Sequence, residues 1–220
     1  MSRKIPRALE PAGIVLLDKP AGISSFAAIA ELRRTTGART GHAGTLDPFA
    51  TGLLVVLSGS ATRLAQSFVK LDKRYLTEID LTATTSTGDP EGDVVETHDV
   101  PAPEELEERL EALRGEIELP IPAASAVKID GERAYRLHRK GVAVEMPLRR
   151  SRVDALDVVG STGETVTLDL RVSSGTYVRA IAEALGGHCR TLRRTEVGPF
   201  SVEEAGPRVI PSDEALARLA

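Results

Sequence analysis

The sequence contains few of the residues that mark several common classes of protein. It has a single cysteine, Cys189, so this chain alone can form neither an intramolecular disulfide nor a cysteine-based zinc site. Tryptophan is absent and only 3% of the residues are aromatic, so the core must rest on aliphatic side chains. The four histidines show no metal-binding spacing such as H-x-x-x-H. We therefore expect no bound metal.

Long hydrophobic runs are also missing. The longest aliphatic run, Leu53–Leu57, is far shorter than the roughly 20 residues that a membrane-spanning helix needs. Residues 1–13 are polar and contain no apolar stretch of the kind found in a secretory signal. Neither G-x-G-x-x-G nor G-x-x-x-x-G-K-[ST] occurs, which argues against a Rossmann fold and a P-loop. Together these absences indicate a reduced, cytoplasmic protein with no membrane partner.

Charge is unevenly distributed along the chain, although the net charge of −4 by itself argues against nucleic-acid binding. Residues 89–118 contain twelve acidic residues and two arginines, whereas residues 128–152 contain eight basic and three acidic residues. A basic segment is compatible with RNA binding, but charged helices and loops that are merely solvated would give the same pattern.

Hydrophobic periodicity predicts an α+β protein with a mixed, largely antiparallel sheet flanked by helices and loops. Strands are expected at residues 14–17, 53–57, 74–81 and 166–172, and also around Ala126. Helices are expected at residues 24–36, with either Ser24 or Ser25 as the cap, and at residues 62–71, 103–114, 133–140 and 177–185. Ser212 is expected to cap a last short helix.

The segment Thr40–Pro48 is the least ordinary in composition, because Asp47 precedes a proline and follows two glycines, Gly41 and Gly44. Glycines let a backbone approach another molecule closely, and Pro48 disfavours the α-helical region for Asp47. A carboxylate held by such a loop can act as a nucleophile or as a general base. An Asp-Pro turn is also common in loops without a catalytic role, so these residues alone leave both interpretations open.

Three further features are candidates for binding or chemistry. Tyr75 begins an alternating strand and is either a core aromatic residue or a platform on which a base stacks. Arg179 lies at a strand-to-helix junction, where it is either solvated or paired with a buried carboxylate such as Asp47. Arg139 and Lys140 belong to the basic segment and are candidates for phosphate contact.

Taken together, these motifs resemble those of the tRNA pseudouridine synthase B family. Residues 192–194 and 197–198 extend the match, which covers roughly residues 13–200. The resemblance implies the pseudouridine synthase fold and a catalytic domain over residues 1–200, in which residues 89–118 form an acidic appendage. The main blocks that agree in order and approximate spacing are Asp18–Ser25, Gly41–Pro48, Asp72–Tyr75, Pro122–Gly141 and Gly175–Arg179.

By this resemblance the chain would isomerise the uridine at position 55 in the T loop of tRNA to pseudouridine. The base would be flipped from its stack, and the glycosidic bond would be cleaved and re-formed. Asp47 would be the catalytic carboxylate, Tyr75 would stack on the uracil, and Arg179 would pair with Asp47. The resemblance implies no cofactor, and it leaves open which atom Asp47 attacks. His42 would bind substrate by occupying the space that flipped nucleotides leave. The other substrate-binding residues would be Tyr177, Leu192, Lys19, Lys128, Arg139 and Lys140.

The chain departs from the family at its C-terminal end. Family members usually carry an RNA-binding domain of the PUA type after the catalytic domain, whereas here only a short extension, residues 201–220, is expected. The expected partner is the T stem-loop of tRNA, with no obligatory protein partner and a monomeric state. Three other roles stay open: a tRNA-folding chaperone, a subunit of a guide-RNA-dependent pseudouridine synthase, and a general nucleoside-binding module.

Overall fold

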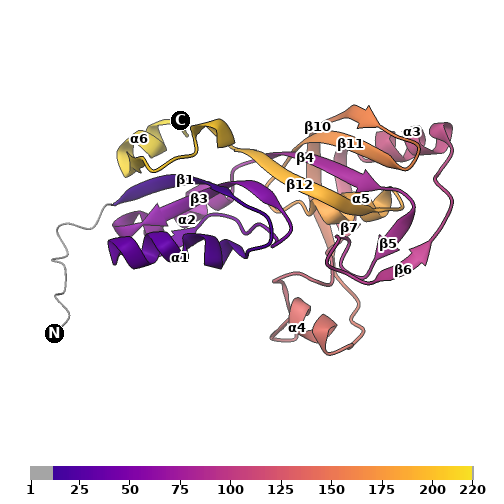
Figure 1. The fold of residues 1–220 in the computed structure, drawn as a ribbon, viewed down its shortest axis with the longest axis horizontal. Coiled ribbons are helices and arrows are strands. Elements are labelled where there is room, and N and C mark those ends of the chain that lie inside the picture. Colours follow the sequence, from indigo (N-terminus) through magenta and orange to yellow (C-terminus); the bar gives the residue numbers. More distant parts are fainter. Residues whose placement is uncertain (1–11, 220) are drawn as a thin grey trace. The chain divides into compact units, whose positions relative to one another are not determined.

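The computed structural model describes residues 12–219, which form two compact units (Figure 1). The first unit comprises residues 12–75 and 192–219, and the second comprises residues 76–191. The expectation about a secretory signal concerns mostly residues 1–11, which lie outside the described residues. Within residues 12–219, no helix has both the length and the apolar character needed to cross a membrane.

The first unit is built on a mixed sheet. Strand β1 (Gly13–Lys19) pairs antiparallel with β14 (Val209–Pro211) on one side and with β3 (Thr51–Ser58) on the other. Strand β3 also pairs antiparallel with β2 (Thr40–His42) and parallel with the end of β12 (His188–Val197). The predicted strands at residues 14–17 and 53–57 are thereby confirmed, and so is the mixed sheet.

Both faces of strand β3 are covered by helices. Its odd-numbered apolar residues pack with Phe68 of α2 (Ala65–Val69), which follows a 3₁₀ turn, η2 (Gly59–Leu64). Its even-numbered apolar residues pack on the opposite face with Ile29 of α1 (Ser25–Thr36). Because neither face is solvated, β3 is a continuous apolar run in the sequence, as is usual for strands buried on both sides.

Helix α1 begins and ends where the sequence predicts. The Ser24 hydroxyl accepts a hydrogen bond from the backbone N–H of Ala27 at 3.1 Å, which makes Ser24 the N-cap. Gly37 ends the helix in the left-handed conformation, at φ 65°, and its N–H donates to the carbonyl of Arg33 at 3.0 Å. The structure therefore assigns the cap to Ser24 and leaves Ser25, which is buried, for another role.

The residues after β12 complete the core of the first unit. Strand β13 (Phe200–Ser201) brings the Phe200 ring to 5.9 Å from the Phe68 ring, and η3 (Val202–Glu204) follows. Ala215 of α6 (Ser212–Ala217) packs in the same apolar cluster. The prediction that Ser212 caps this helix is wrong by one residue, because the cap is Pro211 and Ser212 is the first helical residue.

The second unit, which takes β4 from residue 76 onward, contains a sheet in the strand order β4-β11-β10-β7. Strands β10 and β11 are antiparallel, as are β10 and β7. The long strand β10 was not predicted, because its register against β11 shifts at two bulges and the period-two alternation is interrupted there. The strands are β4 (Lys73–Asp80), β11 (Thr165–Val172), β10 (Leu148–Ser161) and β7 (Gly115–Pro120).

The acidic residues 89–118 are spread over several elements of the second unit. They follow β5 (Ala83–Thr85) and include β6 (Val94–Thr97), which pairs with β5, and α3 (Pro103–Ala112). Leu110 of α3 is 3% exposed, so the acidic helix packs on the unit through an apolar stripe. Helix α5 (Val178–Ala184) lies where a helix was predicted.

Residues 121–147 form an arm between β7 and β10 that contains β8 (Lys128–Ile129), β9 (Glu132–Arg133) and α4 (Ala134–Arg139) (Figure 1). The predicted helix is confirmed, whereas the strand expected around Ala126 is displaced by two residues, to β8. The carbonyl of Val127 accepts the N–H of Ala134 at 2.8 Å, and that of Ser125 accepts the N–H of Tyr135 at 3.0 Å. These carbonyls satisfy the first N–H groups of α4 and do not pair in a sheet.

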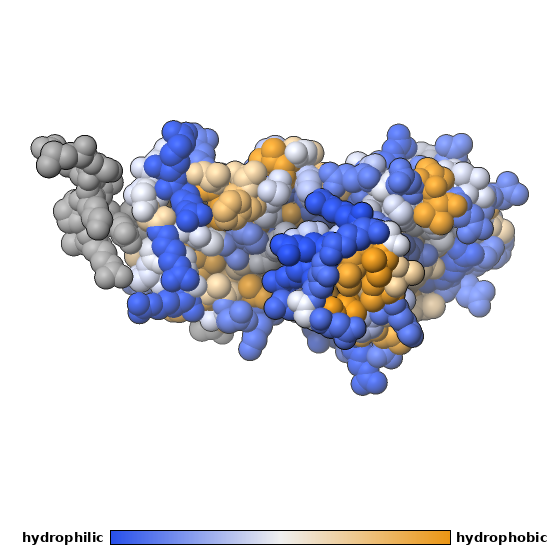
Figure 2. All heavy atoms as spheres, turned by 90° about the horizontal axis from the view of Figure 1, so that it is seen from below, coloured by the Kyte–Doolittle hydropathy of each residue, from blue (hydrophilic) through white to orange (hydrophobic). Residues whose placement is uncertain are grey.

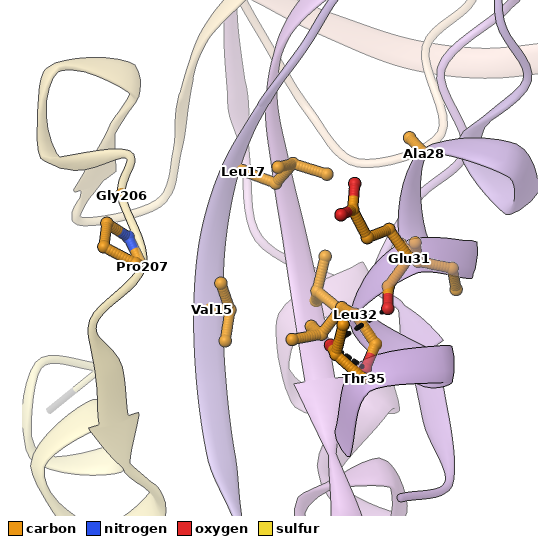
Figure 3. Close-up of a pocket in the computed structure, with 10 residues that line it drawn as sticks. Val15, Leu17, Ala28, Glu31, Leu32, Thr35, Gly206 and Pro207 are labelled. Carbon is orange, nitrogen blue, oxygen red and sulfur yellow. Dashed lines mark hydrogen bonds between the residues drawn. The ribbon is translucent and has the colours of Figure 1, made fainter. Parts of the chain in front are cut away.

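A groove of about 360 Å³ lies in the first unit between α1 and β1 (Figure 3). Val15 and Leu17 of β1, Leu32 of α1, and Pro207 contribute apolar lining, and Glu31 adds a carboxylate at its edge. None of the residues predicted to bind substrate or to act in catalysis lines this groove.

Substitution of Gly52 tests how closely β3 and β12 must approach. Gly52 has φ +99°, and a Cβ there would lie 2.2 Å from the carbonyl oxygen of Arg194. We expect Gly52→Ala to lower the free energy of unfolding by roughly 2–5 kcal/mol, from backbone strain and overlap. Gly163→Ala is the control, since a Cβ there meets nothing within 4 Å. Urea denaturation measures both, and equal effects for the two variants would contradict the expectation.

Candidate functional site

Asp47 lies in a tight turn between β2 and β3 of the first unit. Its carbonyl accepts a hydrogen bond from the N–H of Ala50 at 3.2 Å, which closes the turn. The residue is half-buried. The sequence thus places a carboxylate next to a proline, and the fold adds a closed turn that limits where the carboxylate can point.

Lys19 is fully buried and holds the backbone on the C-terminal side of Asp47. Its ammonium donates to the carbonyls of Pro48 at 3.1 Å, Ile23 at 2.8 Å and Pro20 at 2.9 Å. The N–H of Gly22 also donates to the carbonyl of Pro48, at 2.8 Å. A buried ammonium is tolerated here because each of its three hydrogens has an acceptor. Lys19 therefore supports the Asp47 turn.

Ser25 holds the backbone on the N-terminal side of Asp47, a role that the sequence did not indicate. Its hydroxyl donates to the carbonyl of Leu46 at 2.8 Å and accepts from the N–H of Leu46 at 2.8 Å. Ser25 is 2% exposed and Leu46 is 3% exposed, so both hydrogen bonds are shielded from water.

Arg194 is a second residue whose importance only the structure shows, although the sequence placed it in a matching block. Its guanidinium is 1% exposed and donates from Nε to the carbonyl of Leu53 at 2.7 Å. Nη2 donates to the carbonyl of Gly44 at 3.1 Å. Gly44 belongs to the same loop as Asp47, so this buried arginine ties β12 to the loop.

Burial, followed by the positive charge of Arg194, lowers the pKa of the His42 imidazole below its ordinary value. Both effects disfavour the imidazolium form, so His42 is neutral at pH 7. Its Nδ1 atom is buried and has no hydrogen-bond partner within residues 12–219. His42 is thus a half-buried, uncharged ring at the start of the Asp47 loop.

Burial is also the main cause that lowers the pKa of Lys73 to about 8, with Arg194 adding to the effect and Asp72 opposing it. The ammonium donates to the carbonyls of Val69, at 2.6 Å, and Leu71. Lys73 therefore binds the end of α2 to the start of β4, two residues before Tyr75.

Tyr75 and Leu192 are the other predicted site residues of the first unit. Tyr75 on β4 is 8% exposed, and Leu192 on β12 is 7% exposed. Such burial suits both core packing and a platform that offers one face to a base. The binding role of each residue therefore stays a prediction.

Arg179 of the second unit is 3% exposed in the first turn of α5, so the alternative of a solvated arginine is wrong. Its Nη1 donates to the carbonyl of Thr87 at 2.5 Å, and its Nη2 donates to that of Ala124 at 3.0 Å. Nη1 also lies 3.5 Å from Oδ2 of the buried Asp89. Pairing with a buried carboxylate is confirmed for Asp89, and pairing with Asp47 stays a prediction.

In the sequence, Asp89 is one of the twelve acidic residues of the segment 89–118. It is 4% exposed, and its Oδ1 accepts from the hydroxyl of Thr87 at 2.6 Å and from the N–H of Glu91 at 3.0 Å. Residues 86–93 thus form a polar turn. Over residues 12–219, no three histidine, cysteine or acidic side chains are grouped so that they could hold a metal ion.

The remaining predicted residues lie around α5 and on the arm. Tyr177 is half-buried and caps α5. Lys128, Arg139 and Lys140 are exposed, with the Arg139 guanidinium 5.7 Å from the centre of the Tyr135 ring and Lys140 Nζ 2.6 Å from a Glu132 carboxylate oxygen. The side of the molecule that carries α4 faces the viewer in Figure 2, where hydrophilic residues surround a smaller hydrophobic patch.

The two units share the predicted site residues between them. The first unit holds Lys19, His42, Asp47, Tyr75 and Leu192, and the second holds Lys128, Arg139, Lys140, Tyr177 and Arg179. Of these, Lys19 and Asp47 are connected through the Pro48 carbonyl, and His42 and Asp47 share one loop that Arg194 binds.

The chain is similar to known proteins over most of its length. Residues 33–178 match the family model described as TruB family pseudouridylate synthase (N terminal domain). The chain is 46% identical over 217 residues to tRNA pseudouridine synthase B of Mycobacterium sp. (strain KMS), covering 92% of this chain and 72% of the relative. It is 43% identical over 232 residues to tRNA pseudouridine synthase B of Corynebacterium efficiens, covering 96% of this chain and 78% of the relative.

Solved structures show the same fold. The chain is similar to one described as "Crystal Structure of a Cbf5-Nop10-Gar1 Complex", with a TM-score of 0.67 and 28% identity. That match covers 90% of this chain and 53% of the other, so the chain spans about half the length of that relative. A "Crystal structure of pseudouridylate synthase" matches with a TM-score of 0.50 and 18% identity, over 96% of this chain and 75% of the other. The predicted pseudouridine synthase fold is confirmed.

The low pKa of Lys73 predicts how its contribution to stability depends on pH. Its folded-state pKa of about 8 lies below the unfolded value of about 10.4, so between these values the unfolded state binds more protons. The contribution of Lys73 to stability must therefore increase as pH rises. From about pH 7.5 to 9.5, we expect the free energy of unfolding of the wild type to gain about 1–2 kcal/mol relative to Lys73→Met.

Urea denaturation at both pH values measures this difference, with Lys70→Met as the control. Lys70 is exposed at the end of α2, so its substitution removes the same charge and side-chain type without removing a buried ammonium. A difference for Lys73→Met that stays constant or reverses would contradict the expectation.

Proposed function

The chain belongs to the TruB family of pseudouridylate synthases, and on this premise we propose that it isomerises the uridine at position 55 in the T loop of tRNA. Relatives that are 40% to 46% identical are named tRNA pseudouridine synthase B, which makes the chain an isomerase acting on tRNA. The observation that carries the proposal is the Asp47 turn, in which a half-buried carboxylate lies between two anchored residues.

The chemistry needs one ionised carboxylate and no redox partner. The bond between uracil N1 and ribose C1′ breaks, the base turns, and C5 bonds to C1′; C5 then loses a proton while N1 gains one. Atoms and electrons balance within the nucleotide, so the reaction requires no cofactor. Attack by Asp47 on the ribose, attack on the base and removal of a ribose proton all require its ionised form.

The uracil must leave the T-loop stack before this chemistry, at a cost on the order of a few kcal/mol. We propose that Tyr75 stacks on the flipped uracil, while Tyr177 and Leu192 line its pocket. Neutral His42 suits the space that the flipped nucleotides leave, because an uncharged ring stacks among bases without desolvating a cation. Arg179 would keep Asp47 ionised by pairing with it.

The exposed basic residues of the arm are proposed to bind the T stem. Lys128, Arg139 and Lys140 are on the surface of the arm, where phosphate groups can reach them. The Tyr135 ring beneath Arg139 restricts the guanidinium without neutralising its charge. Such contacts position an RNA without reading its sequence.

A subunit of a guide-RNA-dependent enzyme is the second candidate, because the chain is 28% identical to a protein solved in a Cbf5-Nop10-Gar1 complex. The higher identity, 46%, to tRNA pseudouridine synthase B favours action on tRNA without a guide. A chaperone role would not require the fixed Asp47 turn. The monomeric state, the independence from protein partners and the cytoplasmic location stay predictions.

Mapping of pseudouridine in a tRNA transcript tests the proposal directly. We expect the wild-type chain to convert U55, and we expect Asp47→Asn to convert none while its affinity for tRNA stays within about tenfold. The substitution removes the charge and keeps the side-chain shape, so the chemistry should be lost and the binding retained. A transcript with cytidine at position 55 is the substrate control. Substantial turnover by Asp47→Asn, or conversion at another position only, would contradict the proposal.

The salt dependence of tRNA binding tests the basic arm. If Arg139→Ala combined with Lys140→Ala removes two phosphate contacts, the slope of log K against log salt should become shallower by roughly one to two units. Binding should weaken uniformly for different tRNA sequences, because phosphates carry no sequence information.

A charge-matched control separates phosphate contact from a general loss of positive charge. Arg114→Ala combined with Arg208→Ala also removes two positive charges, from residues whose guanidinium groups form ion pairs with Glu111 and Glu214. This control should keep the wild-type slope. An unchanged slope in the arm variant, or an equal change in both, would show that the arm does not bind phosphates.

A further inference from the structure

We infer that the Ser25 hydroxyl positions Asp47 for catalysis by holding the backbone of Leu46 at both of its polar atoms. The inference rests on the proposed function, because it assigns Ser25 a part in the same reaction. Ser25 is a positioning residue that acts through the neighbour of Asp47.

A single hydroxyl can make both hydrogen bonds at once. It donates one hydrogen, here to the carbonyl of Leu46 at 2.8 Å, and its lone pairs accept the N–H of the same residue at 2.8 Å. Ser25 is 2% exposed, so water is not available to replace either hydrogen bond. Loss of the hydroxyl would leave both polar atoms of Leu46 without this partner in a buried place.

The two residues that flank Asp47 are held by the same segment of chain. Ser25 binds Leu46, while Lys19 and the N–H of Gly22 bind the carbonyl of Pro48 at 3.1 Å and 2.8 Å. With both neighbours fixed, the Asp47 carboxylate can move only through its own backbone and side-chain torsions. Release of the Leu46 side would let the whole turn shift.

Helix α1 makes Ser25 a rigid anchor. Ser25 is the first residue of a 12-residue helix that packs on β3 through Ile29. Ser24 caps that helix, so the position of Ser25 is set by a helix terminus and not by a loose loop. The packed core of the first unit therefore sets the position of the Asp47 turn, through α1 and Ser25.

Ser24 supplies a matched comparison within the chain. The two serines are adjacent and chemically identical, and from the sequence either could cap α1. In the structure the exposed Ser24 hydroxyl bonds to the N–H of Ala27, within the helix, whereas the Ser25 hydroxyl bonds to Leu46, 21 residues away. Removal of the Ser24 hydroxyl should destabilise α1 without releasing the Asp47 turn.

The test compares wild type, Ser25→Ala, Ser25→Cys and Ser24→Ala on a U55 tRNA transcript, below the unfolding temperature of each variant. Cysteine fills the site with a slightly larger sulfur atom and weakens the hydrogen bonds, so it separates positioning from the loss of packing in Ser25→Ala. We expect kcat to fall by about 10- to 100-fold in both Ser25 variants, because a small misplacement of a catalytic group has a large effect on rate. KM should stay within about threefold, and Ser24→Ala should keep kcat within about threefold of wild type.

Two results would overturn the inference: folded Ser25 variants that keep kcat within about threefold of wild type, or a loss in Ser24→Ala as large as that in Ser25→Ala. If Ser25→Ala does not fold, Ser25→Cys decides the matter by the same criterion. Failure of the proposed function gives a different result, in which wild type and Ser24→Ala also form no pseudouridine.

Discussion

The placement of Asp47 depends on buried hydrogen bonds between residues 19–25 and the Leu46–Pro48 backbone. Lys19 and Ser25 are both buried, and their polar atoms bond to peptide groups on either side of the carboxylate. Breaking such bonds leaves buried polar groups without partners, which costs more than making them gains. The loop therefore stays in place because any shift would break these buried hydrogen bonds. Its glycines and Pro48 allow the turn, and the hydrogen bonds fix its position.

Arg194 sets the electrostatics of the same loop. Its buried guanidinium bonds to the carbonyls of Leu53 and Gly44, so hydrogen bonds compensate its burial. Its charge also helps to lower the pKa values of His42 and Lys73. A neutral His42 beside a permanently charged arginine avoids one more buried cation near Arg194, and it leaves an uncharged ring at the edge of the Asp47 loop.

In the second unit, hydrogen bonds likewise compensate the burial of two charged side chains, those of Arg179 and Asp89. Arg179 on α5 is held by the carbonyls of Thr87 and Ala124 and by the carboxylate of Asp89. Asp89 is itself held by the Thr87 hydroxyl and the N–H of Glu91. Asp89, a member of the acidic segment, thus pairs with Arg179, which the number of charges in the segment does not reveal. The acidic face of α3, by contrast, lies on the surface.

Elements whose signals are local could be predicted from the sequence alone. Periodicity and caps placed β1, α1, β3 and β11, and the motif spacing singled out Asp47, Tyr75 and Arg179. Local signals failed where pairing is irregular, as in the bulged strand β10, and where carbonyls cap a helix, as around Ala126. The partners of Ser25, Arg179 and Arg194 are visible only in the folded protein, because these contacts join residues 21, 92 and 150 positions apart. No local pattern encodes such a contact, since it exists only once the packed core brings distant segments together and excludes water from between them.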